Sequence, residues 1–552
     1  MQEQWAGCTP SGTTLKIRLA QINPIVGNLQ KNANLIKDII ASSREIDILV
    51  FPELSLTGYP PQDLLLDNNF LDKAEKAIED IKNVTSAQLV IVGTPRREEG
   101  LLYNSAAILK DGDVLGYRDK TLIPSYDVFD ESRYFAPSND IIPINVEIDK
   151  QKISLGIQIC EDLWDDEYNQ KVTSKLIDKG AEMIVNISAS PYRINILDKR
   201  VSLCLDKASY LKYYFIYCNL VGGQDELVYD GQSFIMDSGG KIKQMGKIFK
   251  EDIIDFNTDT DCDKEIARKN SLDEEQIYKG LCLGVKDYFK KSGFKKAILG
   301  LSGGIDSALT AAIAVKALGS ENVVGVSMPS KFSSEHSKSD AKELASNLGM
   351  QFEMIAIDSS YDQIIKSMDV FFDGTPLGLA EENLQARIRG NILMSISNKI
   401  NALLLNTGNK TELALGYCTM YGDMCGALGV ISDLSKLQVY SVSKWINSSF
   451  NKFLIPENTL LKEPSAELRD NQYDPFDYNI VSPMVDLIIN DLVEKDQLIE
   501  MGYSLELIHE VFNLIHRSEY KRRQSPPGIK ISDKAFGLGR RYPIINQFKE
   551  VE

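Results

Sequence analysis

The chain has 552 residues, 43% of them hydrophobic and 25% charged, which is typical of a folded globular protein with two or three domains. Its formal net charge of −17 argues against broad nucleic-acid binding, which needs a basic face, and no apolar run is long enough to cross a bilayer. The N-terminus has no basic patch before an apolar stretch, and the eight cysteines are scattered without a CxxC pair. We therefore expect no signal peptide, reduced thiols and a cytoplasmic protein that binds neither nucleic acid nor membrane.

The first half alternates between strand-like and helical segments, starting from the run KIRLAQI at 16–22. Further strands are expected at 46–53, 87–94, 105–110, 153–160, 182–188 and 213–221, and helices at 29–45 and 67–84. The acidic stretch EDIIDFNTDTDCDKE lacks apolar periodicity. It predicts a linker at 251–270, which separates a first domain at 15–250 from a second domain at 271–552.

The second half opens with an amphipathic helix at 271–293. The elements expected after it are a strand, a glycine-rich turn and a helix within 295–319, a strand at 323–329, a helix at 334–348, and strands at 353–358 and 402–408. Strands that alternate with helices form parallel sheets. We therefore expect an α/β fold, with a parallel sheet in the second domain.

Three fragments of the first half carry the residue types of a reactive thiol site. They are FPELSLTGYP around Glu53, YRDKTLIPSYDVFDESRYF around Lys120 and GIQICEDLWD around Cys160, each key residue at or just after a strand-like run. A nucleophilic thiol needs a base and nearby positive charge. The histidines all lie in the other half, at His336, His509 and His516. A carboxylate such as Glu53 would then take the proton of Cys160, although spacing alone favours a packed core thiol.

In these local contexts, the set of Glu53, Lys120 and Cys160 resembles the nitrilase, or carbon–nitrogen hydrolase, superfamily. The strings LIPSYDVFDESRYF and NLVGGQDELVYDGQSFIMDSGG are more specifically similar to the glutaminase domains of NAD synthetases, and this likeness covers nearly all of 15–250. The resemblance implies an αββα sandwich. It makes Glu53 the general base, Lys120 the group that stabilises the intermediate, Cys160 the residue that forms a γ-glutamyl thioester, and Glu131 a supporting carboxylate.

The same resemblance implies that Tyr126 and Ser190 hold glutamine. Relatives carry a Lys or Arg six residues after the serine, but this chain has Ile196 there. Two explanations are open: one of three nearby basic residues supplies the missing charge, or the loop is shifted. The three residues are Arg193, Lys199 and Arg200. Arg193 is our assignment to the glutamine pocket.

The segment LGLSGGIDS follows an apolar strand and opens a helix in the second half. Gly303 and Gly304 let the backbone approach phosphates, and the helix N-terminus adds amide donors. Asp306 would repel phosphate without a cation between them, so it implies Mg²⁺. No kinase-type phosphate loop is present. The segment resembles the N-type ATP pyrophosphatases, which implies a Rossmann-like parallel sheet and an ATP site comprising Gly300, Leu301, Ser302, Gly303, Gly304, Ile305, Asp306, Ser307 and Thr407.

Several longer strings narrow the substrate. EENLQARIRGNILM, NTGNKTELALGYCTMYGDMCGALGVISDLSK, KEPSAELRDNQ and YKRRQSPPGIKISDKAFGLGRRYPI are similar to the synthetase domain of NAD synthetases over 270–545. The resemblance implies that Asp306 and Glu412 hold Mg²⁺ and that deamido-NAD contacts Asn383, Glu412 and Lys521. It places Asp423 in a mobile loop over the site and makes Lys436 a ligand contact.

Together the two halves predict an enzyme that amidates deamido-NAD to NAD with ATP, Mg²⁺ and ammonia released from glutamine. The expected products are NAD, AMP, pyrophosphate and glutamate. Ammonia must travel as NH₃, which implies an enclosed passage, and we expect a homo-oligomer. The main competing hypothesis is an amidotransferase of the same ATP class that acts on another substrate. Two further hypotheses are a non-catalytic module with one degenerate half, and an amidase that is merely fused to the second domain.

Overall fold

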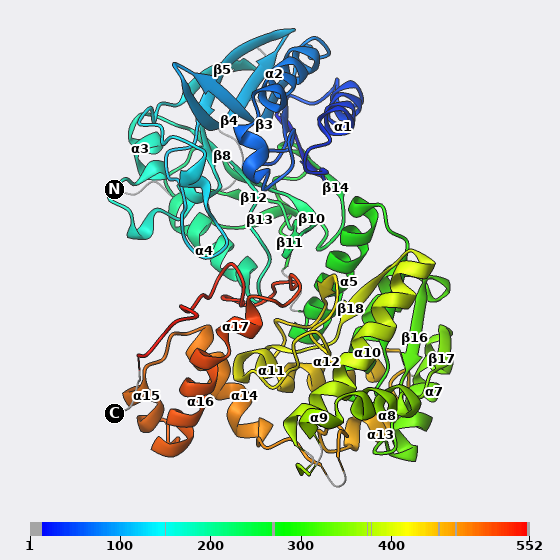
Figure 1. Cartoon of the computed structure of the whole chain (residues 1–552). Coiled ribbons are helices and arrows are strands. Elements are labelled where there is room, and N and C mark those ends of the chain that lie inside the picture. The colour runs from blue at the N-terminus through cyan, green and yellow to red at the C-terminus, as the bar shows by residue number, and fades with distance from the viewer. Residues whose placement is uncertain are drawn as a thin grey trace. The chain divides into compact units, whose positions relative to one another are not determined.

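The structure is a computed structural model and describes residues 14–148, 151–267, 271–372, 374–376, 378–450, 453–469 and 472–548 (Figure 1). The chain forms two compact units: Met1–Gln224 with Val228–Asn270, and Asp225–Leu227 with Ser271–Glu552. The polar N-terminal lead-in and Cys8 lie outside the described residues. No helix among the described residues is both long and apolar enough to span a membrane.

Two six-stranded sheets form the first unit. The first sheet has the order β14 (Asp252–Asn257), β1 (Lys16–Gln21), β2 (Ile48–Val50), β3 (Leu89–Glu98), β4 (Leu101–Lys110) and β5 (Asp113–Asp119). The second has the order β13 (Ile242–Met245), β12 (Phe234–Asp237), β9 (Tyr214–Asn219), β8 (Met183–Ser188), β7 (Gln151–Ile159) and β6 (Ile144–Ile148). The central strands β1–β2–β3 and β7–β8–β9 run parallel, and the outer strands pair antiparallel.

One apolar core joins the two sheets, because alternate side chains of each strand point to the same face. It includes Ile17, Leu19, Val50, Ile91, Ile157, Val185 and Ile216. Helices α1 (Leu29–Ala41) and α2 (Asn68–Lys82) pack on the first sheet, and α3 (Val172–Asp178) and α4 (Ile196–Ala208) pack on the second (Figure 1). The predicted αββα sandwich is therefore confirmed.

The predicted linker at 251–270 begins too early. Residues Asp252–Asn257 form β14, which pairs antiparallel with β1 at the edge of the first sheet. Ile254 and Phe256 point into the core while Asp255 faces outward. This short period-2 alternation is the signature of an edge strand, and the acidic composition of the stretch concealed it.

The second unit is built on a fully parallel five-stranded sheet, as predicted. Its order is β17 (Gln351–Met354), β16 (Val323–Ser327), β15 (Lys296–Gly300), β18 (Ala402–Asn406) and β19 (Leu428–Gly429). Ile298 packs with α8 (Asp358–Ser367) and α10 (Leu379–Ile400), whereas α6 (Ile305–Leu318) contacts β15 and β16. The strand expected at 353–358 ends at Met354, since this edge strand is largely exposed.

The other helices complete the second unit. They are α5 (Asp273–Ser292), α7 (Glu335–Leu348), α9 (Asp369–Phe372), α11 (Lys410–Leu415), α12 (Lys436–Ser449), α13 (Glu457–Leu461), α14 (Tyr478–Ile489), α15 (Lys495–Glu500), α16 (Leu505–Arg517) and α17 (Glu519–Arg522). Helices α11, α14, α15 and α16 share one apolar cluster. The hairpin β10 (Val221–Gln224) and β11 (Leu227–Asp230) and the 3₁₀ turns Gln62–Leu66, Glu131–Arg133, Cys160–Leu163, Asp165–Glu167 and Ser320–Asn322 complete the regular structure.

Candidate active sites

The ends of three strands bring the predicted thiol site together. Lys120 directly follows β5, Cys160 directly follows β7, and Glu53 comes three residues after β2. Cys160 has a φ of +44° and starts a 3₁₀ turn, so the chain bends sharply at the sulfur. A non-glycine residue in the left-handed region is uncommon and marks a constrained position. The thiol is buried, with 5% of the residue exposed.

A buried ammonium joins two carboxylates beside the thiol. Lys120 Nζ lies 2.8 Å from Glu53 Oε1 and 2.8 and 2.9 Å from the two oxygens of Glu131. Tyr59 OH donates to Glu131 over 2.7 Å, and Asn104 Nδ2 donates to Glu53 over 2.8 Å. Both carboxylates are thus oriented by several donors, which is the rigidity a catalytic group needs. Tyr59 and Asn104 were missed in the sequence: Tyr59 lies in the fragment around Glu53 but was not singled out there, and Asn104 lies outside the three fragments.

The electrostatics of this site keep the thiol protonated in the resting protein. Burial raises the pKa of Cys160 well above its usual value, Glu53 raises it further, and Lys120 opposes both. Burial by itself would lower the pKa of Lys120, but Glu131 and Glu53 hold that pKa well above its ordinary value. Lys120 is therefore permanently charged. If Cys160 acts as the predicted nucleophile, its proton has to leave, and the neighbouring carboxylates are the available acceptors.

The serine predicted to hold glutamine is fixed by a buried arginine. Arg200 Nε and Nη2 lie 3.2 and 3.1 Å from Ser190 Oγ, and Nη1 makes two 2.9 Å bonds to the carboxylate of Asp230. Both members of this ion pair are fully buried. Ile196 is the first residue of α4 and is buried. As an apolar residue, it cannot replace the basic side chain that relatives carry at this position. The sequence suggested Arg200 only as a possible ligand contact, and its pairing with Asp230 was not foreseen.

Two tyrosines hold the carboxylate of Glu161, the residue that follows Cys160. Tyr126 OH donates to both oxygens of Glu161, over 3.0 and 3.1 Å, and Tyr168 OH donates to Glu161 over 2.9 Å. Arg193 is partly buried, and burial followed by repulsion from Arg200 lowers its pKa. Lys199, by contrast, is exposed. Glu161 directly follows the nucleophile in sequence, which is the signal that could have identified it.

The glycine-rich turn of the second unit connects β15 to α6 as predicted. Gly303 has a φ of +79°, and a Cβ there would lie 2.4 Å from the carbonyl oxygen of Ser337, so only glycine fits without movement. Gly304 caps α6, and its amide donates to Ser302 Oγ over 3.2 Å. Ser307 Oγ donates to the carbonyl of Gly304 over 3.0 Å. The turn therefore presents small hydroxyl and amide groups at a helix N-terminus, which favours phosphate.

This turn faces a cavity of about 320 Å³. Most of the predicted ATP residues line the cavity: Gly300, Leu301, Ser302, Gly304, Ile305, Asp306, Ser307 and Thr407. Glu412, Asp423 and Lys436 also line it. Arg389, which was not singled out in the sequence, joins them, and burial lowers its pKa to about 10. Its signal was the string EENLQARIRG, whose second arginine it is.

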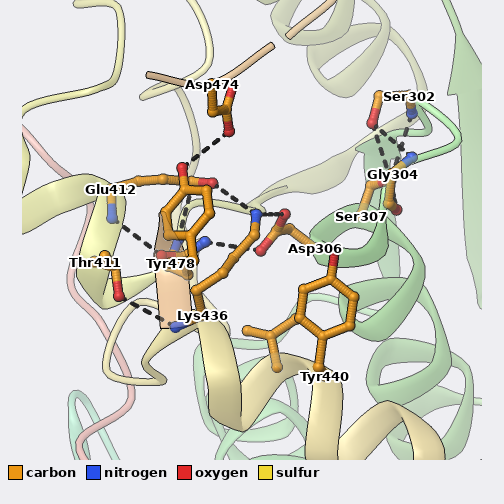
Figure 2. Close-up of polar contacts among 12 residues, drawn as sticks. Ser302, Gly304, Asp306, Ser307, Thr411, Glu412, Lys436, Tyr440, Asp474 and Tyr478 are labelled. Carbon is orange, nitrogen blue, oxygen red and sulfur yellow. Dashed lines mark hydrogen bonds and ion pairs between the residues drawn. The ribbon is translucent and has the colours of Figure 1, made fainter. Parts of the chain in front are cut away.

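Lys436 bridges the two predicted metal ligands at the edge of this cavity (Figure 2). Its Nζ lies 2.6 Å from Asp306 Oδ2 and 3.1 Å from Glu412 Oε1. Asn409 Nδ2 donates to Asp306 Oδ1 over 2.8 Å, and Tyr478 lays its ring 5.2 Å from Nζ. Burial raises the pKa of Glu412 to about 7, with Lys436 opposing and Asp306 adding to the shift. Two hard carboxylate oxygens converge here, which suits a magnesium ion shared with phosphates.

Asn383 and Lys521, which were predicted to contact deamido-NAD, hold the loop that borders the cavity. Lys521 Nζ donates to the carbonyl oxygens of Gly416 and Cys418 over 2.6 and 2.7 Å. Thr419 Oγ1 donates to Asn383 Oδ1 over 2.8 Å. Neither residue lines the cavity itself. Their contact with a ligand stays a prediction.

Known proteins match both halves of the chain. A family model described as carbon–nitrogen hydrolase matches residues 16–262, and one described as NAD synthase matches residues 277–525. The glutamine-dependent NAD(+) synthetase of Synechocystis sp. is 43% identical and is aligned over 96% of this chain and 99% of its own length. That of Thermotoga maritima is 39% identical over 97% and 99%.

A solved structure agrees over the full length. The glutamine-dependent NAD+ synthetase from Acinetobacter baumannii, in complex with adenosine diphosphate, matches with a TM-score of 0.77 at 37% identity and covers 98% of this chain and 100% of that chain. The thiol site and the nucleotide cavity thus both lie within matched regions. The chain belongs to the glutamine-dependent NAD synthetases.

Proposed function

We propose that this chain converts deamido-NAD to NAD, using ATP in one unit and glutamine in the other. The observation that carries the proposal is the presence of two chemically complete sites in one chain. The first holds a buried thiol beside Lys120, Glu53 and Glu131. The second holds a phosphate-binding turn that contains Asp306 and lines one cavity together with Glu412. A function that used only one of these sites would leave the other site without a role.

In the thiol unit, Glu53 takes the proton of Cys160 as the sulfur attacks the side-chain amide carbon of glutamine. The negative charge that develops on the amide oxygen is stabilised by the Lys120 ammonium. Glu53 then returns the proton to the departing nitrogen, and NH₃ leaves a γ-glutamyl thioester. Water, deprotonated by Glu53, attacks the thioester carbon and releases glutamate and the thiol. Glu131 acts by holding Lys120 in position.

Glutamine recognition falls to Tyr126, Ser190 and Arg193 in this proposal. Arg200 pairs with Asp230 and Ser190, and we assign the partly buried Arg193 to the α-carboxylate. Arg193→Ala should raise the KM for glutamine by about tenfold or more, as expected for the loss of one charged contact. Lys199→Ala is the matched control and should leave that KM unchanged. Equal effects of the two substitutions would refute the assignment.

In the nucleotide unit, the turn from Gly300 to Ser307 and Thr407 hold ATP, and the nicotinate carboxylate of deamido-NAD attacks the α-phosphorus. Pyrophosphate leaves, and the resulting acyl adenylate carries a good leaving group that a free carboxylate lacks. NH₃ then attacks the acyl carbon, and AMP departs with formation of the amide. We assign Asn383, Glu412 and Lys521 to deamido-NAD.

Asp306 and Glu412 are the residues that would hold Mg²⁺. The fit is supported by their converging oxygens and by the adjacent phosphate-binding turn. When bound, the ion neutralises phosphate charge during adenylation. Among the described residues, no cluster of three or more His, Cys, Asp or Glu side chains could bind a metal, so substrate oxygens are needed to complete this one.

The decisive assay supplies deamido-NAD, ATP, Mg²⁺ and glutamine to the purified full chain. NAD, AMP, pyrophosphate and glutamate should appear in equal amounts, because each turnover makes one of each. Absence of NAD with this mixture would reject the proposal and favour another acceptor carboxylate. None of the seven cysteines of the described residues forms a disulfide, which supports the proposed cytoplasmic setting. The homo-oligomer and the enclosed ammonia path stay predictions.

A further inference from the structure

The side chain of Lys436 places a positive charge between the two predicted metal ligands, Asp306 and Glu412. Lys436 is the first residue of α12, and its side chain is only 3% exposed. Its backbone amide donates to Thr411 Oγ1, which is paired with Ser482 Oγ at 2.9 Å. The root of the side chain is therefore fixed, and its ammonium reaches Asp306 and Glu412 from a rigid base (Figure 2).

Asn409 and Lys436 contact different oxygens of the Asp306 and Glu412 carboxylates. Asn409 donates its side-chain amide to Asp306 Oδ1 and its backbone amide to Glu412 Oε2, over 2.8 and 3.3 Å. The remaining oxygens, Oδ2 of Asp306 and Oε1 of Glu412, converge on the Lys436 ammonium. The point between the two carboxylates is thus already filled by a positive charge.

A divalent cation bound by Asp306 and Glu412 would need those same two oxygens. An ammonium and a metal ion compete for them, because the two positive charges repel each other at contact distance. We propose that Lys436 is a built-in counter-ion that competes with the metal for Asp306 and Glu412, so that metal binds tightly only together with nucleotide. This inference rests on the proposed magnesium site.

The cavity offers the displaced ammonium another partner when nucleotide is bound. Lys436 lines the same cavity as Ser302 and Ser307 of the phosphate-binding turn. A triphosphate there provides oxygens for the ammonium and, at the same time, oxygens that complete the coordination of the metal. The ring of Tyr478, 5.2 Å from Nζ, supplies an uncharged surface along which the ammonium stays stabilised as it moves. Metal alone brings no such replacement partner.

The test measures binding of Mn²⁺, a stand-in for Mg²⁺ that is visible by electron paramagnetic resonance, to the full chain. Without nucleotide, Lys436→Met should bind Mn²⁺ about tenfold or more tightly than the wild type, because the competing charge is gone. Lys436→Arg keeps the charge and should bind as weakly as the wild type. Lys462→Met is the matched control, since it removes another cavity lysine that is paired with Glu467 rather than with the metal carboxylates.

Addition of ATP closes the thermodynamic cycle. ATP should tighten Mn²⁺ binding to the wild type by about tenfold or more. The same effect of ATP should be smaller in Lys436→Met. The reduction should equal the factor by which this variant binds Mn²⁺ more tightly than the wild type when no nucleotide is present. Mn²⁺ alone should raise the melting temperature of Lys436→Met but not that of the wild type. If the methionine variant does not fold, Lys436→Gln removes the same charge and keeps a hydrogen-bond donor.

The outcomes separate the two claims. If neutral variants at Lys436 bind Mn²⁺ no more tightly than the wild type while ATP still brings tight metal binding, the competition is refuted and the proposed metal site stands. If no form binds Mn²⁺ even with ATP, the proposed metal site and this inference both fail.

Discussion

At the scale of single residues, the thiol site combines a protonated thiol with a charged lysine. Burial and Glu53 push the pKa of Cys160 up, and Lys120 opposes them without cancelling them. A side chain of this kind is unreactive toward general electrophiles yet becomes nucleophilic when a substrate lies against its base. Such an arrangement protects the thiol between turnovers.

Alkylation of Cys160 by iodoacetamide should therefore be slow at neutral pH. Because an acid with a raised pKa stays protonated until the pH approaches that pKa, the rate should rise about tenfold per pH unit from about pH 7 to about pH 9. Mass spectrometry of the peptide that contains Cys160 follows the reaction. A rate that levels off below about pH 8 would mean that the thiolate already forms there.

Removal of Arg200 should destabilise the first unit. Arg200→Met leaves the Asp230 carboxylate buried without its partner, which costs about 3–5 kcal/mol in the free energy of unfolding. The double variant with Asp230→Asn removes the stranded charge and should recover part of that loss. Urea denaturation measures all three proteins. If the double variant were as unstable as the single one, the cost would come from packing rather than from the stranded carboxylate.

At the scale of elements, the turn between β15 and α6 depends on the backbone of Gly303. Gly303→Ala must relieve a 2.4 Å contact with Ser337 in addition to adopting a positive φ. We expect a loss of about 1–3 kcal/mol in stability and weaker ATP binding, as the turn shifts from the phosphate-binding geometry. Calorimetric titration with ATP and thermal unfolding measure the two effects.

Gly293 provides the control for backbone strain alone. It ends α5 with a φ of +85°, and a Cβ there would meet nothing within 4 Å. Gly293→Ala should cost about 1–2 kcal/mol, the usual cost of the left-handed region, and leave ATP affinity unchanged. Similar losses of ATP affinity in both alanine variants would show that the Ser337 contact does not matter.

Residue pattern alone predicted the elements that have strong local signals. The turn from Gly300 to Ser307 was recognisable because a buried strand, two glycines and a helix start follow one another in sequence. β14 was missed because its alternation spans a few residues inside an acidic stretch. The partners Tyr59 and Asn104 could not be predicted, since only the fold brings them to Glu131 and Glu53. Cys160 was predicted to be the nucleophile from resemblance rather than from spacing, and this role stays a prediction.

At the scale of the whole molecule, the two units divide one reaction between them. Each has its own sheet and its own core, so loss of chemistry in one unit need not unfold the other. In the proposed mechanism, the nucleotide unit accepts NH₃ from any source, because the adenylate reacts with any NH₃ that reaches it. An amidase that is merely fused to the second domain would show the same independence, and a glutaminase rate that deamido-NAD and ATP do not stimulate would favour it.

The most direct measurement compares NAD formation by the wild type and by Cys160→Ala, with either glutamine or ammonium chloride as the nitrogen source. The wild type should make NAD from both. The variant should lose glutamine-dependent synthesis by about a thousandfold or more, as expected when a covalent nucleophile is removed, and keep most of its ammonia-dependent synthesis. Equal loss of both activities, or full retention of glutamine use, would contradict the division of labour between the two units.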